Sequence, residues 1–180
     1  MIRRLLIALA AVALSLTAFV AATTAAPPQM FVTPLNSHEE TAPATDMSHA
    51  RGVAVFQLNA AGTELSYRLI ASNITNIVQA HIHCCAPLGT TAGIVVWLAP
   101  STTPGVLIPA GGGRTDGVLA TGTITSANFI GGLSGMSMAD LVAALRAGGA
   151  YVNVHNNDGV APTNTGPGDF PGGEIRGQID

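Results

Sequence analysis

The sequence contains no lysine, and only 9% of its 180 residues carry a charge. When Arg3 and Arg4 near the N-terminus are set aside, five arginines face ten acidic residues, and the net charge is −5. A nucleic-acid partner requires a basic surface that neutralises phosphates. We therefore expect no nucleic acid among the partners of this protein.

Aromatic residues are also scarce, at 4%, although hydrophobic residues reach 48%. The core must therefore consist mainly of valine, isoleucine, leucine and alanine. The 21 glycines and 11 prolines provide many turns between short apolar segments. This pattern predicts an all-β sandwich of seven or eight short strands in a single domain.

Alternation of apolar and polar residues locates the expected strands. They are residues 29–35, 51–58, 64–71, 78–85, 94–98, 117–125, 151–155 and 174–179. One helix is expected at 138–147, because Ser137 and Asp140 form a capping-box pattern and Gly148 is a stop signal.

The N-terminus has the layout of a secretory signal peptide over residues 1–26. A basic start (1–4) precedes an uncharged apolar run (5–20) and a stretch of small residues (21–26) that suits cleavage. An uncleaved membrane anchor is the alternative, because the run approaches spanning length. We expect residues 27–50 to open the domain with a strand and a polar loop, and 51–180 to form its main body. The mature protein would be secreted or periplasmic, in the cell envelope, and would have no membrane contact.

Only two cysteines are present, Cys84 and Cys85, and they are neighbours. A bridge between neighbours closes a very small ring, so the pair is no ordinary disulfide staple. Three interpretations of Cys85 stay open: a thiolate ligand for a metal ion, one half of a bridge with Cys84, or an intermolecular contact.

The segment 78–85 has two different faces when it forms a strand, because side chains alternate. Its apolar face carries Val78, Ala80, Ile82 and Cys84, and its polar face carries Gln79, His81 and His83. The segment 151–155 repeats this pattern, with Asn153 and His155 on the polar face. If the two strands are neighbours, the three imidazoles converge on the outer wall, facing solvent. Neutral imidazoles suit copper or zinc, and on the first of the three interpretations of Cys85 its thiolate would be the fourth ligand.

The final strand carries Glu174 and Arg176 opposite to its apolar residues. Together with Asn153, they are expected to surround the ligands and orient a histidine. The alternative is a surface ion pair that contributes little stability.

Simpler interpretations exist for most of these residues. Histidines on an exposed strand are often only solvated, and His38 and His49 in the polar loop are expected to be so. Trp97, within an apolar run, is expected in the core. Asp158 and Asp169 lack the spacing of calcium ligands.

Four blocks carry a family resemblance: 80–83 (Ala-His-Ile-His), 93–98, 149–155 and 173–179 (Gly-Glu-Ile-Arg-Gly-Gln-Ile). Together they resemble the CHRD domain, first described in chordin, over about 35–179. Residues 35–43 are similar to its opening acidic block, with Glu39 or Glu40 as the acid. The resemblance implies an immunoglobulin-like Greek-key barrel, similar in fold to copper–zinc superoxide dismutase.

By that analogy, His81 and His83 match the dismutase's strand pair of copper ligands, and His155 matches its later ligand. No bridging histidine or histidine-rich zinc loop is visible between Gly93 and Asp116. The resemblance therefore favours copper over zinc.

Three functions follow from the sequence. The first is an exported binding module with a copper-type site, and its partner would be the metal ion or an unidentified protein. The second is a copper-only redox enzyme of the dismutase type, and the third is a structural or protein-interaction module without metal. We assign no catalytic residue and favour the binding module over an enzyme.

Overall fold

The computed structural model describes residues 29–41, 43–44, 47–100, 107–110 and 112–180. The predicted signal peptide lies outside these residues. In the described ranges, no helix is long and apolar enough to span a membrane.

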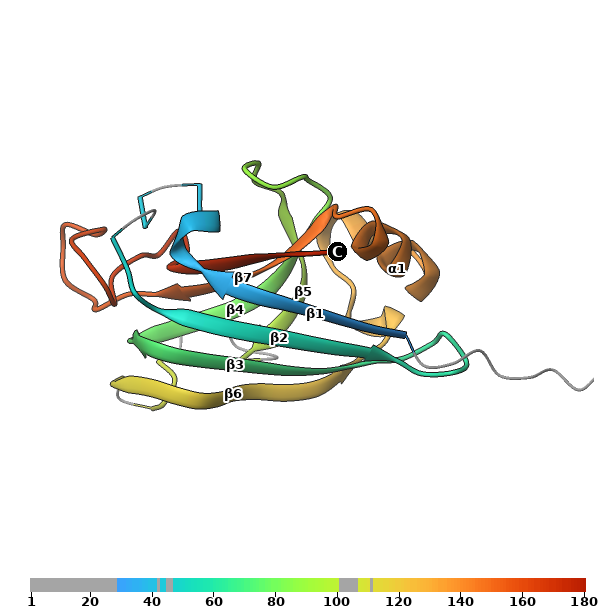
Figure 1. The fold of residues 1–180 in the computed structure, drawn as a ribbon, viewed down its shortest axis with the longest axis horizontal. Coiled ribbons are helices and arrows are strands. Elements are labelled where there is room, and N and C mark those ends of the chain that lie inside the picture. Colours follow the sequence, from blue (N-terminus) through green and yellow to red (C-terminus); the bar gives the residue numbers. More distant parts are fainter. Residues whose placement is uncertain (1–28, 42, 45–46, 101–106, 111) are drawn as a thin grey trace, which may run out of the picture.

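Eight strands follow one another with only short helices between them (Figure 1). They are β1 (Gln29–Asn36), β2 (Arg51–Leu58), β3 (Leu65–Thr75), β4 (Ile77–Cys84), β5 (Gly93–Ala99), β6 (Arg114–Ile124), β7 (Ala150–Asn156) and β8 (Ile175–Ile179). The α-helix α1 spans Met138–Arg146, and single 3₁₀ turns lie at η1 (Ser37–Glu39), η2 (Ser126–Asn128) and η3 (Gly131–Leu133). The predicted all-β fold with one short helix is confirmed.

The strands form one antiparallel sheet in the order β5-β4-β7-β8-β1-β2-β3-β6. The sheet curls into a nearly closed barrel, so its two edge strands, β5 and β6, approach each other. The Tyr67 hydroxyl on β3 spans the gap and donates to the Leu98 carbonyl on β5 at 2.8 Å. In this strand order β3 and β4, which are neighbours in the sequence, do not pair with each other, and β4 pairs instead with β7.

The core fills the inside of this curled sheet. Alternate residues of every strand point inward; examples with almost no exposed surface are Phe56, Leu69, Ile82 and Val152. Ile82 and Val152 lie opposite each other in the β4–β7 register. Burial of such side chains stabilises the fold by about 1.5–3 kcal/mol each.

Helix α1 covers one end of the barrel, beside the C-terminus (Figure 1). The predicted capping box is present: the Asp140 backbone N–H donates to Ser137 Oγ, and the Asp140 carboxylate accepts from the Ser137 backbone N–H. Leu141, Val142 and Leu145 form its buried face.

The outer face of β4, β7 and β8 is covered as well, and this decides the character of the site. Three segments lie over it: residues 37–41 after β1, the β4–β5 connection and the long β7–β8 connection. The prediction that this wall faces solvent is therefore wrong.

Candidate metal centre

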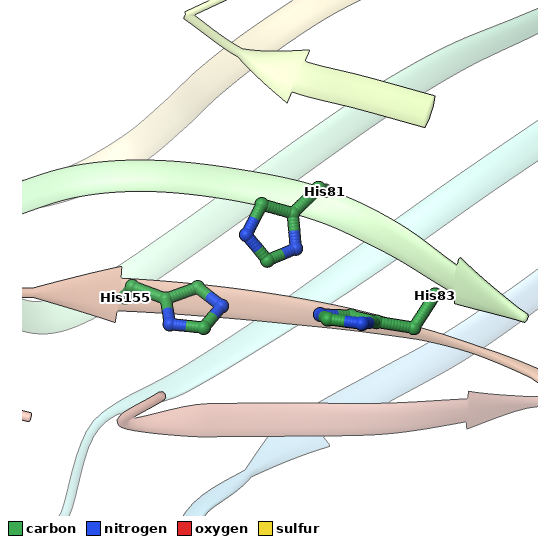
Figure 2. Close-up of side chains that lie close together, drawn as sticks. All are labelled: His81, His83 and His155. Carbon is green, nitrogen blue, oxygen red and sulfur yellow. The ribbon is translucent and has the colours of Figure 1, made fainter. Parts of the chain in front are cut away.

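The three predicted histidines come together on this covered face. His81 and His83 project from β4, and His155 projects from β7 beside them, with the rings turned toward one another (Figure 2). One ligand nitrogen from each ring lies within 4.8 Å of the other two. The ring centroid of His81 is 4.5 Å from that of His83 and 4.4 Å from that of His155.

Strand register explains this convergence. His83 lies opposite Tyr151 in the β4–β7 pair, and Gln79 lies opposite His155. Residues that face each other across a ladder share one face of the sheet. The i, i+2 spacing on β4 and the same period on β7 therefore place all three imidazoles together.

The imidazoles are buried and neutral. His81 has no exposed surface, and His83 and His155 are 9% and 6% exposed. Burial lowers the pKa of His81 to about 2, with help from its two histidine neighbours. Burial also lowers the pKa of His155 to about 4, and it lowers the pKa of His83. At neutral pH each ring therefore has a lone pair available to a metal ion.

Two backbone carbonyls select the tautomers. His83 Nδ1 lies 2.7 Å from the Ala92 oxygen, and His155 Nδ1 lies 2.8 Å from the Pro171 oxygen. A carbonyl can only accept, so each Nδ1 carries the proton and each Nε2 keeps a lone pair. Metal-binding histidines are oriented in this way.

The nitrogens that remain have no protein partner. His83 Nε2, His155 Nε2 and both nitrogens of His81 are buried without a hydrogen bond. An unpaired buried polar atom costs about 1–3 kcal/mol. Several such atoms aimed at one another are what a metal-free ligand set is expected to show, and three imidazoles are a suitable donor set for copper or zinc.

The spacing requires a small adjustment when an ion binds. Two nitrogens that share one ion at about 2.0–2.1 Å lie at most about 4.2 Å apart. In the cluster the three ligand nitrogens lie within 4.8 Å of one another, which is slightly more than this distance. A modest rotation of the rings would bring the nitrogens close enough to share one ion.

Aromatic rings pack against the ligands. The Tyr151 ring stacks on His83 with centroids 4.6 Å apart and planes 9° apart. The half-buried Trp97 lies edge-on to His81 at 5.0 Å. The prediction that Trp97 belongs to the core is wrong: it lies opposite His81 in the β4–β5 register and shares the histidine face.

Arg176 lies near the histidine cluster and, besides burial, its charge helps to lower the pKa of His83. Its guanidinium lies 3.5 Å from the centre of the Tyr151 ring and donates to the carbonyls of Thr90 and Pro87 at 2.9 and 3.3 Å. It thereby fastens the β4–β5 connection, whose Ala92 carbonyl orients His83. Arg176 thus influences His83 both through this connection and through its charge.

Asn153 lies opposite both His81 and Arg176 in the strand registers. Its amide donates to Glu40 Oε2 at 3.3 Å. Burial raises the pKa of Glu40 to about 7, and the nearby Arg176 charge opposes this shift. The predicted acidic block at the N-terminal side therefore reaches the site through Glu40, while Glu39 accepts from the Gln178 backbone N–H at 2.8 Å.

Glu174 anchors the β7–β8 connection. Its carboxylate accepts from the Ser48 hydroxyl, the Asn156 side chain and the Gly168 backbone N–H. It is fully buried and pairs with none of the described arginines. The same connection carries Pro171, whose carbonyl accepts from His155 Nδ1.

The remaining predicted residues lie elsewhere. Cys84 and Cys85 form a disulfide with each other, and Cys85 is outside the histidine cluster. His38 and His49 are exposed, as expected.

Sequence reasoning missed Tyr151, Ser48 and the position of Trp97. The signal for Tyr151 was present, because it continues the i, i+2 period of Asn153 and His155. Ser48 lies in an aperiodic loop and carries no such signal.

Comparison with known proteins supports the resemblance seen in the sequence. The family model of the CHRD domain matches residues 31–179. Neither the search of curated proteins nor the search of solved structures returned a match. The matched range contains all eight strands, apart from the first two residues of β1. The chain belongs to the CHRD domain family.

Proposed function

We propose that this protein is an exported binding module that holds one copper ion on His81, His83 and His155. The observation that carries the proposal is the convergence of buried, neutral imidazole nitrogens that have no protein partner. A metal ion would satisfy these atoms together. Export is proposed from the signal-like N-terminus and agrees with a disulfide, which persists in oxidising compartments.

Copper is the preferred ion for two reasons. For the same nitrogen ligands, copper(II) binds more tightly than zinc. A structural zinc site takes four protein ligands, whereas three His/Cys/Asp/Glu residues gather here among the described residues. Zinc is therefore the weaker candidate.

The experiment measures metal retained after dialysis. We expect about one copper per chain in the wild type and less zinc when both ions are offered equally. His155→Gln should lose the copper, since the substitution removes a ligand nitrogen. His49→Gln, which removes an exposed histidine outside the cluster, should keep it.

Two other outcomes would overturn the proposal in different ways. Copper retention that is equal in the wild type and His155→Gln would mean that the histidine cluster only shapes the wall, as in a module without metal. Superoxide consumption by the loaded protein well above that of free copper would instead make it a redox enzyme of the dismutase type.

A further inference from the structure

A cavity of about 420 Å³ lies beside the histidine cluster, where β4 begins and β7 ends. Its lining includes Val78, Gln79, Leu107, Asn157, Asp158 and Pro171. Asp158 is exposed and lies at the rim, whereas Gln79 and Pro171 are half-buried and lie deeper. The cavity is therefore open to solvent at Asp158 and borders the ends of the two strands that carry the histidines.

Two of the lining residues contact or flank His155. The Pro171 carbonyl accepts the hydrogen bond from His155 Nδ1 at 2.8 Å. Gln79 lies directly opposite His155 in the β4–β7 register, so the two side chains are neighbours on one face. His155 therefore lies next to the lining of this cavity.

The chemistry of the lining favours a cation. Among the described lining residues, Asp158 is the only charged one, and Gln79 and Asn157 add amide groups. The buried cation of the neighbourhood, Arg176, is held by the carbonyls of Thr90 and Pro87 on the β4–β5 connection. An anion would thus meet a carboxylate and no described cation in the cavity, while a metal cation would be attracted.

The rim is held in place by its own side chains. Asp158 Oδ1 accepts from the Val160 backbone N–H at 2.8 Å, and Asn157 Oδ1 accepts from the Gly159 backbone N–H at 2.7 Å. The Asn157 backbone N–H also donates to the Asn76 carbonyl at 3.0 Å. The carboxylate is therefore presented at a fixed place beside the opening.

We propose that this cavity is the entrance by which the metal cation reaches the histidine cluster, and that Asp158 attracts the ion and Gln79 passes it to His155. This inference rests on the proposed function, because it names the route to the same site. It adds that the site takes up a positively charged cargo rather than an anionic substrate.

The test follows copper(II) loading of the metal-free full chain by stopped flow. The chain has a single tryptophan, Trp97, whose ring lies 5.0 Å from that of His81, so its quenching reports arrival of copper at the cluster. Asp158→Asn should slow loading about 3-fold and Asp158→Lys about 10-fold at low salt, because electrostatic attraction raises association rates. Equilibrium affinity should stay within about 2-fold, because Asp158 is not a ligand.

A matched control and a steric variant separate the route from general charge effects. Glu64→Lys changes the same charge at an exposed residue by the β2–β3 hairpin, at the other end of the barrel from the β7–β8 connection, and should leave loading unchanged (Figure 1). Val78→Phe narrows the cavity and should slow copper loading and copper release together.

Equal loading rates in the wild type, Asp158→Lys and Val78→Phe would overturn the proposed entrance while leaving the copper site intact. A wild type whose Trp97 emission and metal content do not respond to copper would overturn the proposed function itself.

Discussion

His81 is the clearest example of a site residue that contributes little to folding stability. It is fully buried, yet neither ring nitrogen has a partner in the protein. Folding gains little from such a side chain, because the desolvation cost of the nitrogens offsets much of the apolar contact of the ring. A residue of this kind is consistent with a ligand kept for binding at the expense of stability.

Replacement of His81 by leucine tests this interpretation. We expect the free energy of unfolding of the metal-free protein to stay the same or rise by about 1–2 kcal/mol, because the unpaired nitrogens are removed. Copper affinity should be lost. Urea unfolding of the metal-free chains measures the first effect.

The neighbouring residue provides the control. Ile82→Ala removes a fully buried side chain on the core face of the same strand and should cost about 2–5 kcal/mol. A similar loss in His81→Leu would show that the imidazole supports the fold, contrary to our account.

Glu40 makes a contribution of its own to the dependence of stability on pH, opposite in sign to that of the three buried histidines. Its pKa is about 7 in the folded protein, against 4.5 for an ordinary glutamate. Between these values this carboxyl therefore binds more protons in the folded than in the unfolded state, and its own contribution to stability falls as pH rises through this window. Arg176 and Asn153 face this carboxylate from β8 and β7, and Glu39 lies next to it in the chain.

Substitution of Glu40 by glutamine isolates this effect. Glutamine resembles the protonated acid and cannot ionise, so the variant should gain stability relative to the wild type from pH 5 to pH 8, by about 3 kcal/mol at most. Urea unfolding of both metal-free chains at the two pH values provides the comparison. A difference that does not change with pH would contradict the assignment.

The elements that cover the site matter as much as the strands that carry it. Glycine is favoured at residue 173 of the β7–β8 connection by its backbone conformation and by two side-chain ends that lie beside it. A Cβ atom there would clash with Asn153 Oδ1 and lie 2.6 Å from Glu40 Oε1, and the φ of Gly173 is +126°. Glu174 then fastens the end of this connection, and Pro171 orients His155.

Gly173→Ala should therefore displace this connection. We expect a loss of about 2–3 kcal/mol from steric strain and unfavourable backbone, together with weaker copper binding as the Pro171 contact shifts. Gly172→Ala is the matched control, because its Cβ would meet nothing within 4 Å. Thermal unfolding and copper titration of both variants test the prediction, and equal behaviour of the two would refute it.

The strands themselves were predictable to within a few residues, whereas their cover was not. Alternation places Arg51–Leu58 at its observed bounds and finds β7 and β8 to within one residue. The burial of His81 depends on loops that contribute Ala92, Pro171 and Glu40, and these have no periodic signal. Sequence alone therefore predicted which histidines share a face, but it left that face in solvent.

At the scale of the whole molecule, the barrel brings distant parts of the chain to one place. Its strand order sets β4 beside β7 and β8 beside β1, so residues near the two ends of the chain share one wall with His81. The core inside the barrel fixes these strands, and the cover outside it excludes water from the cluster. Membership of the CHRD family accounts for the framework, and the histidine cluster is the feature to which we assign the function.

Electron paramagnetic resonance of the full chain loaded with copper(II) tests the central claim most directly. We predict one copper per chain, with hyperfine coupling to several imidazole nitrogens that is retained in His49→Gln and lost together with the bound copper in His155→Gln. A copper signal without nitrogen coupling, or one that is identical in these two variants, would contradict a metal centre built from His81, His83 and His155.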